Sequence, residues 1–489
     1  MLLILSISAF AVDVPISLFP LEKYDQNIDT WLNPNDPAYN NRLVDEKFQK
    51  EKVQEFYKRF YSTDTAGLSP WNPFYVTQLF KEEQSLAEMQ KILLSRFSNE
   101  DKDPAQIGYG ENFRPYPKEW LQKIEDAINL KNYQASQQFD PNKRGILVQN
   151  TAGRVLPTDD VHFYHFTTPG EGYPFDNLQI SSLYAGTPVY SIGQTQDSAW
   201  TLVISPYFIG WVRSESIASV TDGFINTWQK YAKKNLVAIT RTETPVIDSK
   251  NKQFQFKSYV GSLFPLVAEN TTDFSVAIPT KNDEGRAVIR FANVSKEDAA
   301  LMPLPATPKN FARVIKTLQN RPYGWGGMYF YSDCALELKN LYLPFGFYLP
   351  MHSSNQIYAG RMIDKSAETP TERLNYLMQE GRPLRTIVYT EGHIFLYIDK
   401  YDNPFAAEPK KIVMSYQNKW GLKPKDNSRR AILGQGLFLP ILETYPEDPS
   451  LDSLANAKIF KIIDLTAFSD EPENRVAKPT LKSLMGLND

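Results

Sequence analysis

Cysteine and histidine are both scarce in this chain of 489 residues, which contains one cysteine, Cys334. A single cysteine excludes a disulfide within the chain, so the thiol is a small buried side chain, a metal ligand or a nucleophile. The four histidines are His162, His165, His352 and His393. With one cysteine and scattered histidines the sequence has no zinc-binding spacing, and we expect no metal and no cofactor.

A strong charge of one sign is also absent. The 53 Lys and Arg residues nearly balance the 56 Asp and Glu residues, which leaves a net charge of −3. That composition lacks the basic footprint of a nucleic-acid-binding protein. We therefore expect no nucleic-acid partner.

No segment is a transmembrane candidate. The apolar run LLILSISAFA at 2–11 is too short to cross a bilayer as a helix. It ends in Ala-Phe-Ala, a small-residue cleavage pattern, so we expect residues 1–11 to be the signal peptide of an exported protein. No basic residue precedes the run, and two alternatives stay open, a start further upstream and a buried N-terminal strand.

The cysteine lies in a context that favours a nucleophile. It follows the glycine-rich run YGWGG (323–327) and precedes ALELKNLYLPF (335–345), whose apolar spacing predicts a helix. Ser332 or Asp333 is a suitable N-cap for that helix. A thiol in the first helical turn faces the positive end of the helix dipole, which favours the thiolate. The alternative is that Cys334 is a small buried hydrophobic residue.

His393 is a candidate base for such a nucleophile. It opens the strand-like run HIFLYI (393–398), and a second strand-like run (411–416) leads into Gln417, a polar residue that could orient the ring. A cysteine helix, a histidine strand and a polar strand follow one another in papain-like peptidases. The alternative is a hydrogen-bonded structural histidine.

Several motifs in combination resemble the NlpC family of bacterial cell-wall cysteine peptidases. They are PYGWGG (322–327), Asp333-Cys334, LPFGFYLP (343–350), Ser353, Gly392-His393-Ile394 and Gln417-x-x-Trp-Gly. The likeness is to the subgroup with an N-terminal helical region and two bacterial SH3-like domains. It implies a multidomain α+β fold with a helical N-terminal region, two small SH3-like β-barrels and a papain-like α+β cysteine peptidase domain.

The resemblance also implies an activity and its residues. Members are similar to γ-D-glutamyl-L-diamino-acid endopeptidases, which cut peptidoglycan stem peptides. By resemblance Cys334 is the nucleophile, His393 the general base and Gln417 the orienting residue, with the Tyr323 hydroxyl as an oxyanion donor. Two other functions stay open: a peptidoglycan-binding scaffold with an altered pocket, and amide hydrolysis or acyl transfer on another substrate.

Two positions depart from the family pattern. Ala335 replaces a serine that helps to bind the D-glutamyl carboxylate, and Met351-His352-Ser353 replaces Arg-Asn-Ser, so that only Ser353 remains for substrate binding. Loss of one hydrogen bond to a carboxylate costs about 1.5–3 kcal/mol if nothing compensates. Either His352 compensates, or the preferred substrate differs.

In this subgroup the first SH3-like domain restricts the groove to peptides with a free N-terminal L-alanine. By resemblance Asp333, Glu171 (in PGEGYPFDNLQ, 169–179) and Tyr207 bind that ammonium group. The alternatives are an ordinary loop acid and an ordinary barrel tyrosine. The expected ligand is an L-Ala-γ-D-Glu-diamino-acid peptide, and the expected protein is a monomer of the bacterial periplasm or cell envelope.

The domain boundaries follow from changes in residue pattern. Apolar residues recur every three or four positions at 44–62, 73–97 and 117–130. This spacing predicts helices within a helical domain at 22–148. Short runs broken by Gly, Pro and Asp predict the first barrel at 149–220 and the second at 234–303.

A proline-rich linker precedes the last domain. LMPLPATPKN (301–310) has three prolines, which disfavour helix and sheet. The following segment (311–320) predicts an amphipathic helix that begins the peptidase domain. That domain spans 304–489, including a C-terminal extension after Pro440 that we expect to pack on it.

Overall fold

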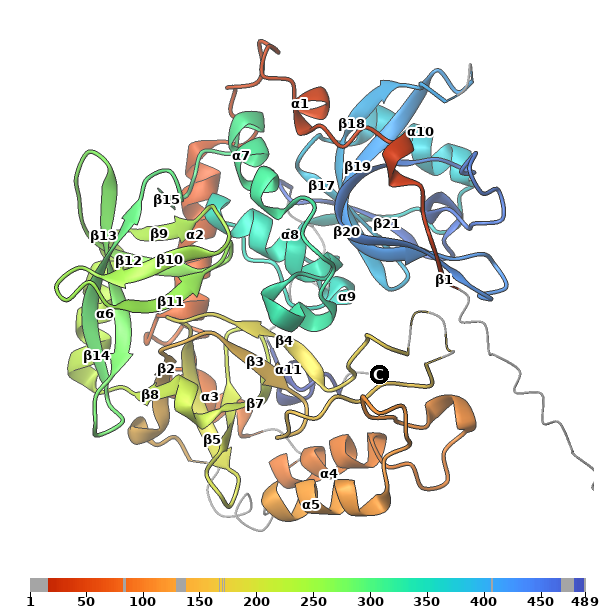
Figure 1. Cartoon of the computed structure of the whole chain (residues 1–489). Helices are drawn as coiled ribbons and strands as arrows, with labels where there is room; N and C mark the ends of the chain where they lie inside the picture. The colour runs from red at the N-terminus through yellow and green to blue at the C-terminus, as the bar shows by residue number, and fades with distance from the viewer. Residues whose placement is uncertain are drawn as a thin grey trace, which may run out of the picture.

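The computed structural model describes residues 16–81, 85–128, 138–166, 168, 170, 172–405, 408–467 and 479–487. The predicted signal peptide at 1–11 lies outside these residues. Within them the strands form three seven-stranded sheets, with a helical region beside the first (Figure 1). The predicted multidomain α+β architecture is confirmed.

Four of the helices lie in the N-terminal helical region: α2 (Glu46–Phe60), α3 (Pro73–Leu79), α4 (Leu86–Arg96) and α5 (Lys118–Ile128). The single pattern at 73–97 corresponds to two helices. Ser85 starts the second one, because its hydroxyl accepts from the Glu88 N–H at 3.2 Å and the Glu88 carboxylate accepts from the Ser85 N–H at 3.0 Å.

The first sheet forms the first barrel. Its strands are β2 (Arg144–Leu147), β3 (Thr151–Arg154), β4 (Gln179–Leu183), β5 (Pro188–Gln194), β6 (Trp200–Ile204), β7 (Ile209–Arg213) and β8 (Ile217–Ser219), in the order β4-β3-β7-β6-β5-β2-β8. Trp211 is fully buried, and its indole N–H donates to Gln90 of α4 at 3.1 Å. This bond attaches the helical region to the barrel.

The second sheet follows α6 (Asp222–Lys234). Its strands are β9 (Leu236–Ile239), β10 (Thr244–Asp248), β11 (Phe254–Ser258), β12 (Leu263–Glu269), β13 (Asp273–Lys281), β14 (Ala287–Ser295) and β15 (Ala299–Met302). Valine, isoleucine and phenylalanine side chains, among them Val246, Phe264 and Ile278, fill its interior.

The third sheet belongs to the peptidase-like domain. Its strands are β1 (Ile16–Leu18), β16 (Arg361–Asp364), β17 (Thr386–Thr390), β18 (His393–Asp402), β19 (Lys411–Leu422), β20 (Arg430–Ile441) and β21 (Phe460–Asp464), in the order β1-β20-β19-β18-β17-β21-β16. β1 pairs with β20 in parallel and the other pairings are antiparallel. The sequence pattern gave no indication of β1.

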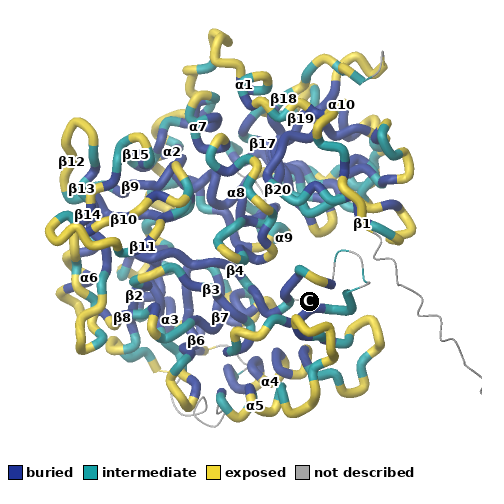
Figure 2. The backbone as a smooth tube through the Cα atoms, in the orientation of Figure 1, coloured by how far each residue is buried: buried dark blue, intermediate teal, exposed yellow. Residues whose placement is uncertain are grey.

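Helices cover both faces of this third sheet. α7 (Pro308–Leu318) and α8 (Cys334–Tyr342) share a core with Leu396 and Tyr416 on one face. α10 (Pro370–Glu380) packs on Phe395 of the other face through Leu377. The central strands are therefore buried on both sides (Figure 2). The helix α8, which begins at the cysteine, is buried along its whole length.

The C-terminal segment differs from the expectation. Strand β21 lies in the peptidase sheet, as a C-terminal extension of that domain should. The short helix α11 (Leu481–Leu484) does not, because Leu481 and Leu484 share a core with Leu93 of α4 and Trp211 of the first barrel. The apolar residues of α11 complete the core between the helical region and the first barrel, so that the chain end ties these parts together.

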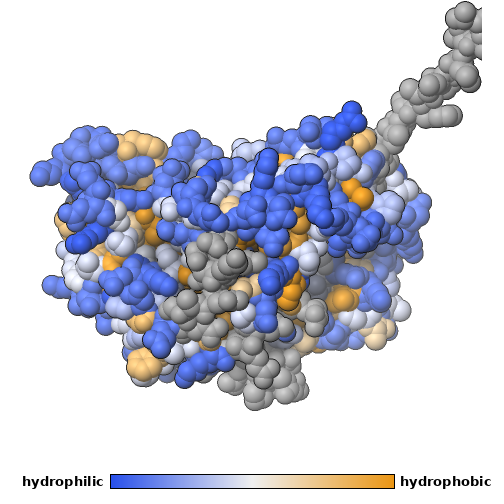
Figure 3. Space-filling view, turned by 90° about the horizontal axis from the view of Figure 1, so that it is seen from below, coloured by the Kyte–Doolittle hydropathy of each residue, from blue (hydrophilic) through white to orange (hydrophobic). Residues whose placement is uncertain are grey.

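The outer surface is largely polar. On the face in Figure 3 hydrophobic residues form scattered patches among hydrophilic ones. Of the helices in the described ranges, none combines the length and apolar character needed to cross a membrane.

A buried glutamine joins the helical region to the peptidase-like domain. Gln49 of α2 is fully buried, and its Nε2 donates to the carbonyls of Leu304 and Phe345, each at 2.9 Å. Its Oε1 accepts from the Ala306 N–H at 3.2 Å. One side chain thus satisfies three backbone groups in the interdomain linker and in the loop after α8.

We predict that Gln49→Leu destabilises the protein by about 2–5 kcal/mol, because it leaves these buried backbone groups without partners. Denaturant unfolding measures the change. The matched control is Gln54→Leu on the exposed side of the same helix, which should stay within about 0.5 kcal/mol of the wild type. Equal stability of the two variants would contradict the assigned role.

Candidate active site

The loop before the cysteine is held directly by the first barrel. In η6 (Trp325–Phe330), Gly326 and Gly327 have positive φ values of 56° and 75°. A Cβ on Gly327 would lie 2.8 Å from the backbone nitrogen of Ser182, so glycine is required there. Gln179 donates to the Gly326 carbonyl at 3.0 Å, and the Ser182 hydroxyl donates to the Gly327 carbonyl. Strand β4 therefore fixes the loop that precedes the candidate nucleophile.

Asp333 connects this loop to α8. It is the N-cap, as predicted: one carboxylate oxygen accepts from the Leu336 N–H at 2.8 Å. The other oxygen accepts from the Gly326 N–H at 3.1 Å. Cys334 follows as the first helical residue, 8% exposed. The carboxylate thus sets both the start of the helix and the position of the thiol.

His393 lies in a chain of hydrogen bonds across three strands. Its Nε2 is 2.7 Å from Oε1 of Gln417, and the Gln417 amide donates to the Ser415 hydroxyl at 2.9 Å. Ser415 in turn donates to the Leu439 carbonyl at 2.6 Å. Since Ser415 must accept from Gln417, the amide oxygen faces the ring. His393 then carries its proton on Nε2, which leaves Nδ1 as a proton acceptor.

The thiol lies beside the backbone of the strand that begins with His393. The Ile394 N–H lies close enough to Cys334 to act on the thiol's pKa, and Ile394 directly follows His393 in β18. No hydrogen bond joins the two side chains, both of which the structure describes. Such bonds are often long before substrate binds.

Both groups are neutral in the resting site at pH 7. Burial, followed by the negative charge of Asp333, raises the pKa of Cys334 to about 12. Burial, followed by the positive charge of Lys419, lowers the pKa of His393 well below its ordinary value. The expectation that the helix terminus makes the thiol acidic is therefore wrong, because desolvation outweighs the dipole.

Aromatic rings from two domains form one wall of the site. Phe175 of the first barrel packs against Trp325 at 5.2 Å and Trp420 at 5.5 Å between ring centroids. Tyr323 lies beside Phe175 and Trp420. The charges of Cys334 and of Asp333 both act on the Tyr323 phenol, whose pKa is raised mainly by burial. Tyr323 thus lies within electrostatic range of the thiol.

The segment with the altered family motif packs partly on the first barrel. Met351 is buried in a cluster with the barrel residues Leu183 and Val203. His352 lies near Asp333, whose carboxyl partly offsets the lowering of the His352 pKa by burial. Ser353 begins the four-residue helix α9 (Ser353–Gln356), which directly follows His352. At the end of α9, Gln356 donates to the Ala335 carbonyl at 2.9 Å, which fixes α9 against α8.

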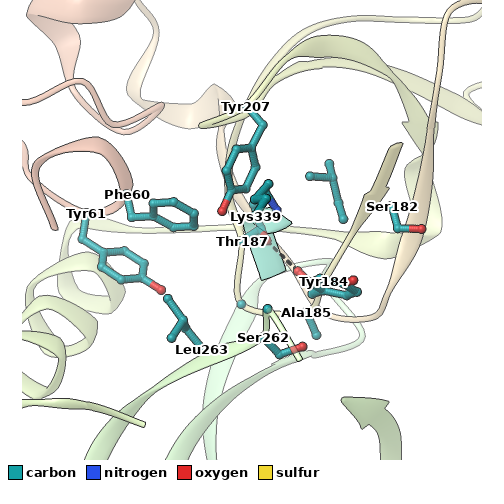
Figure 4. A pocket seen from close by; sticks show the side chains of 13 residues that line it. Phe60, Tyr61, Ser182, Tyr184, Ala185, Thr187, Tyr207, Ser262, Leu263 and Lys339 are labelled. Atoms are coloured by element: carbon teal, nitrogen blue, oxygen red, sulfur yellow. Dashed lines mark hydrogen bonds between the residues drawn. The ribbon is translucent and has the colours of Figure 1, made fainter. Parts of the chain in front are cut away.

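Tyr207 lies where the helical region, both barrels and α8 meet, in the pocket of Figure 4. Its ring covers the buried ammonium of Lys339 at 3.9 Å, and it stacks on Tyr348. Burial lowers the pKa of Lys339 to about 7. Glu171 lies outside the described residues. Substrate binding by Tyr207 and Glu171 stays a prediction, as it does for Asp333, Tyr323 and Ser353.

Sequence reasoning missed several residues of the site. Ser415 and Gln417 are polar residues two apart in an apolar strand, and that alternation could have indicated Ser415. Lys419 continues the same alternation. Phe175 had no local signal, since it reaches the site only through domain packing. Among the described residues no three His, Cys, Asp or Glu side chains gather as a metal site would require.

Comparisons with known proteins place these observations in a family context. A model of SH3 domains of the SH3b1 type matches residues 162–213. Among solved structures, an NlpC/P60 endopeptidase from Photobacterium damselae subsp. piscicida is 28% identical, with a TM-score of 0.78 over 93% of this chain and 100% of that one. An NlpC/P60 family protein from Bacillus cereus ATCC 10987 is 14% identical, with a TM-score of 0.42 over 63% of this chain and 98% of that one. Curated protein sequences give no match.

We predict that Gly327→Ala lowers the free energy of unfolding by more than the cost of placing an alanine at a positive φ. The control is Gly285→Ala, which has the same φ (76°) but no atom within 4 Å of an added Cβ. Strain alone costs about 1–2 kcal/mol. Thermal unfolding should therefore reveal a larger loss for Gly327→Ala, which also displaces β4. Equal losses would indicate that the barrel does not hold the loop.

We predict that iodoacetamide labels Cys334 slowly in the free protein at pH 7. With a thiol pKa of about 12, the thiolate fraction lies more than about a hundredfold below that of a free cysteine. The rate should still increase above pH 9, where a free thiol levels off. Mass spectrometry of the labelled peptide measures the rate, and a profile with a midpoint below pH 8 would contradict the prediction.

Proposed function

We propose that this chain, an NlpC/P60 endopeptidase-like protein with an SH3b-type domain, is a cysteine endopeptidase that hydrolyses peptidoglycan stem peptides. The observation that carries the proposal is the placement of Cys334 at the start of α8, beside a histidine held by Gln417 and Ser415. The likeness to an endopeptidase over 93% of the chain supports it. An envelope location follows from such a substrate.

The reaction begins from a neutral thiol and a neutral imidazole. His393 Nδ1 takes the thiol proton as the Cys334 sulfur attacks the scissile carbonyl. The Cys334 N–H has no acceptor within its helix and, with the Tyr323 hydroxyl, stabilises the oxyanion. The imidazolium then protonates the departing amine, which leaves an acyl-enzyme. Water, activated by the same ring, releases the acid and restores the thiol.

Gln417 orients the ring without adding charge. Its amide oxygen accepts the Nε2 proton and so presents Nδ1 to the thiol. An amide does not stabilise an imidazolium as a carboxylate does. Gln417 and, behind it, Ser415 are thus positioning residues.

The proposed substrate is a peptide cut between γ-D-glutamate and a diamino acid, with a free N-terminal L-alanine. Asp333 supports the free N-terminus, since its half-buried carboxylate directly precedes Cys334 and holds a loop that the first barrel contacts. The resemblance of the sequence motifs to those of γ-D-glutamyl-L-diamino-acid endopeptidases supports the choice of bond. Ser353 is the remaining hydroxyl donor for the glutamyl carboxylate.

Mass spectrometry of products from defined stem peptides tests the activity. The wild type should cleave at one bond, while Cys334→Ala and His393→Ala should lose nearly all turnover. Gln417→Ala should lower kcat about ten- to hundredfold, in line with loss of an orienting group. Binding without cleavage by the wild type would favour a peptidoglycan-binding scaffold, and products from another amide would favour a different hydrolase or acyl transferase.

N-terminal acylation tests the selectivity. Acylation removes the positive charge that Asp333 is proposed to bind and adds bulk at the first barrel. We predict that L-Ala-γ-D-Glu-diamino-acid peptide is cleaved at least about a hundredfold faster than its N-acetyl form, because the acetylated peptide loses the charge-assisted bond to Asp333 and adds bulk at the first barrel. Asp333→Asn is unsuitable alone, since it also weakens the helix cap. Equal kcat/KM values for the two peptides would reject this selectivity.

A further inference from the structure

We propose that Lys419 is a positioning residue that supplies the positive charge which stabilises the Cys334 thiolate. This role goes beyond the proposed function, because it concerns the nucleophile in the free protein and holds whatever the substrate is. It assigns to Lys419 the charge that the neutral Gln417 does not bring to the site.

The strand geometry places Lys419 at the catalytic pair. β18 and β19 are antiparallel, with Leu396 opposite Tyr416. Continuing this register brings Lys419 opposite His393. Residues two apart in a strand share a face, so Lys419 lies on the face of Gln417, which bonds to His393 at 2.7 Å. The pairing with β20 is irregular directly after Lys419, and such bulges reorient side chains beside active sites.

Lys419 has no carboxylate partner. Within the described residues it forms neither an ion pair nor a side-chain hydrogen bond, although it is half-buried. Its charge acts instead on Cys334 and His393. An ammonium group that is partly desolvated and unpaired is unfavourable by itself. A thiolate would give it a partner, and it would give the thiolate one.

Of the charged side chains that act on the thiol, Lys419 is the one whose charge stabilises a thiolate. Asp333, from the N-cap of α8, opposes the thiolate, and Tyr323, from the preceding loop, is a neutral phenol. The Ile394 N–H is the largest of the groups that lower the thiol pKa, and Lys419 follows it as the cation that does so. Burial and then two further cations, Lys423 and Arg430, lower the pKa of Lys419. Its pKa of about 8 keeps it mostly charged at pH 7.

The same charge has opposite consequences for the two reacting groups. A cation favours a thiolate and disfavours an imidazolium. His393 therefore stays a neutral base until it takes the thiol proton, and Lys419 stabilises the sulfur anion that remains. Removal of the charge should raise the pKa of the thiol and also that of His393.

The pH dependence of alkylation tests this directly. Iodoacetamide labelling of the free protein is measured for the wild type, Lys419→Met, Lys419→Gln and Lys419→Arg. Below about pH 8, where Lys419 is charged, loss of the charge should make labelling about tenfold slower at a given pH, which corresponds to one unit of thiol pKa. Lys419→Arg should retain the wild-type rate in that pH range. Circular dichroism and thermal unfolding check the fold, and the Gln variant serves if the Met variant does not fold.

Two further readouts separate charge from structure. The ratio of labelling rates with anionic iodoacetate and neutral iodoacetamide should fall several-fold in Lys419→Met, and the His393 imidazole should titrate at higher pH by NMR. The matched control is Lys425→Met, which removes an exposed cation from the segment after β19 and should leave all three readouts unchanged.

An unchanged alkylation profile in a folded Lys419→Met variant, or an equal shift in Lys425→Met, would overturn the assignment. Because alkylation requires no substrate, this result is independent of the hydrolysis experiments. Failure of the proposed peptidase activity would leave it standing, and failure of the charge role would leave the peptidase activity intact.

Discussion

The carboxylate of Asp333 is the contact on which the site depends. One oxygen caps α8 at the Leu336 N–H, and the other holds the Gly326 N–H of the preceding loop. Cys334 thus follows a residue whose single side chain joins two backbone segments. The same negative charge disfavours a thiolate next to it. The interaction that positions Cys334 therefore also lowers its reactivity, and the remaining groups of the site must offset that cost.

The other domains make this geometry rigid. Strand β4 of the first barrel binds the glycine loop through Gln179 and Ser182, and Gln49 of α2 binds the segments that flank α7 and α8. Phe175 brings the barrel into the aromatic wall. The first barrel is thus part of the site and not an appended module.

Local sequence patterns were sufficient to predict much of this arrangement. The helix at Cys334, its Asp333 cap, the His393 strand and the contact with Gln417 all follow from short motifs, as does the order of helical region, barrels and peptidase domain. The position of α11 and the entry of β1 into the third sheet did not, because they depend on contacts between distant segments. The thiol pKa was mispredicted for a related reason: the helix dipole is local, whereas burial depends on the whole fold.

Cys334 and His393 are both neutral before substrate binds. This is consistent with nucleophilic catalysis if the thiolate and the imidazolium form only when substrate is in place. In a dry site an ion pair of thiolate and imidazolium is costly to maintain, since each charge has lost its water. Here the imidazole has an amide partner, Gln417, which offers no charge. The proton can therefore move as sulfur attacks, and the new negative charge passes from the thiolate to the oxyanion near Tyr323. A cation at Lys419 acts on the thiolate, whereas a carboxylate beside His393 would act on the imidazolium. With a neutral glutamine as the orienting residue, the electrostatic support of the site is thus proposed to act on the nucleophile and not on the base.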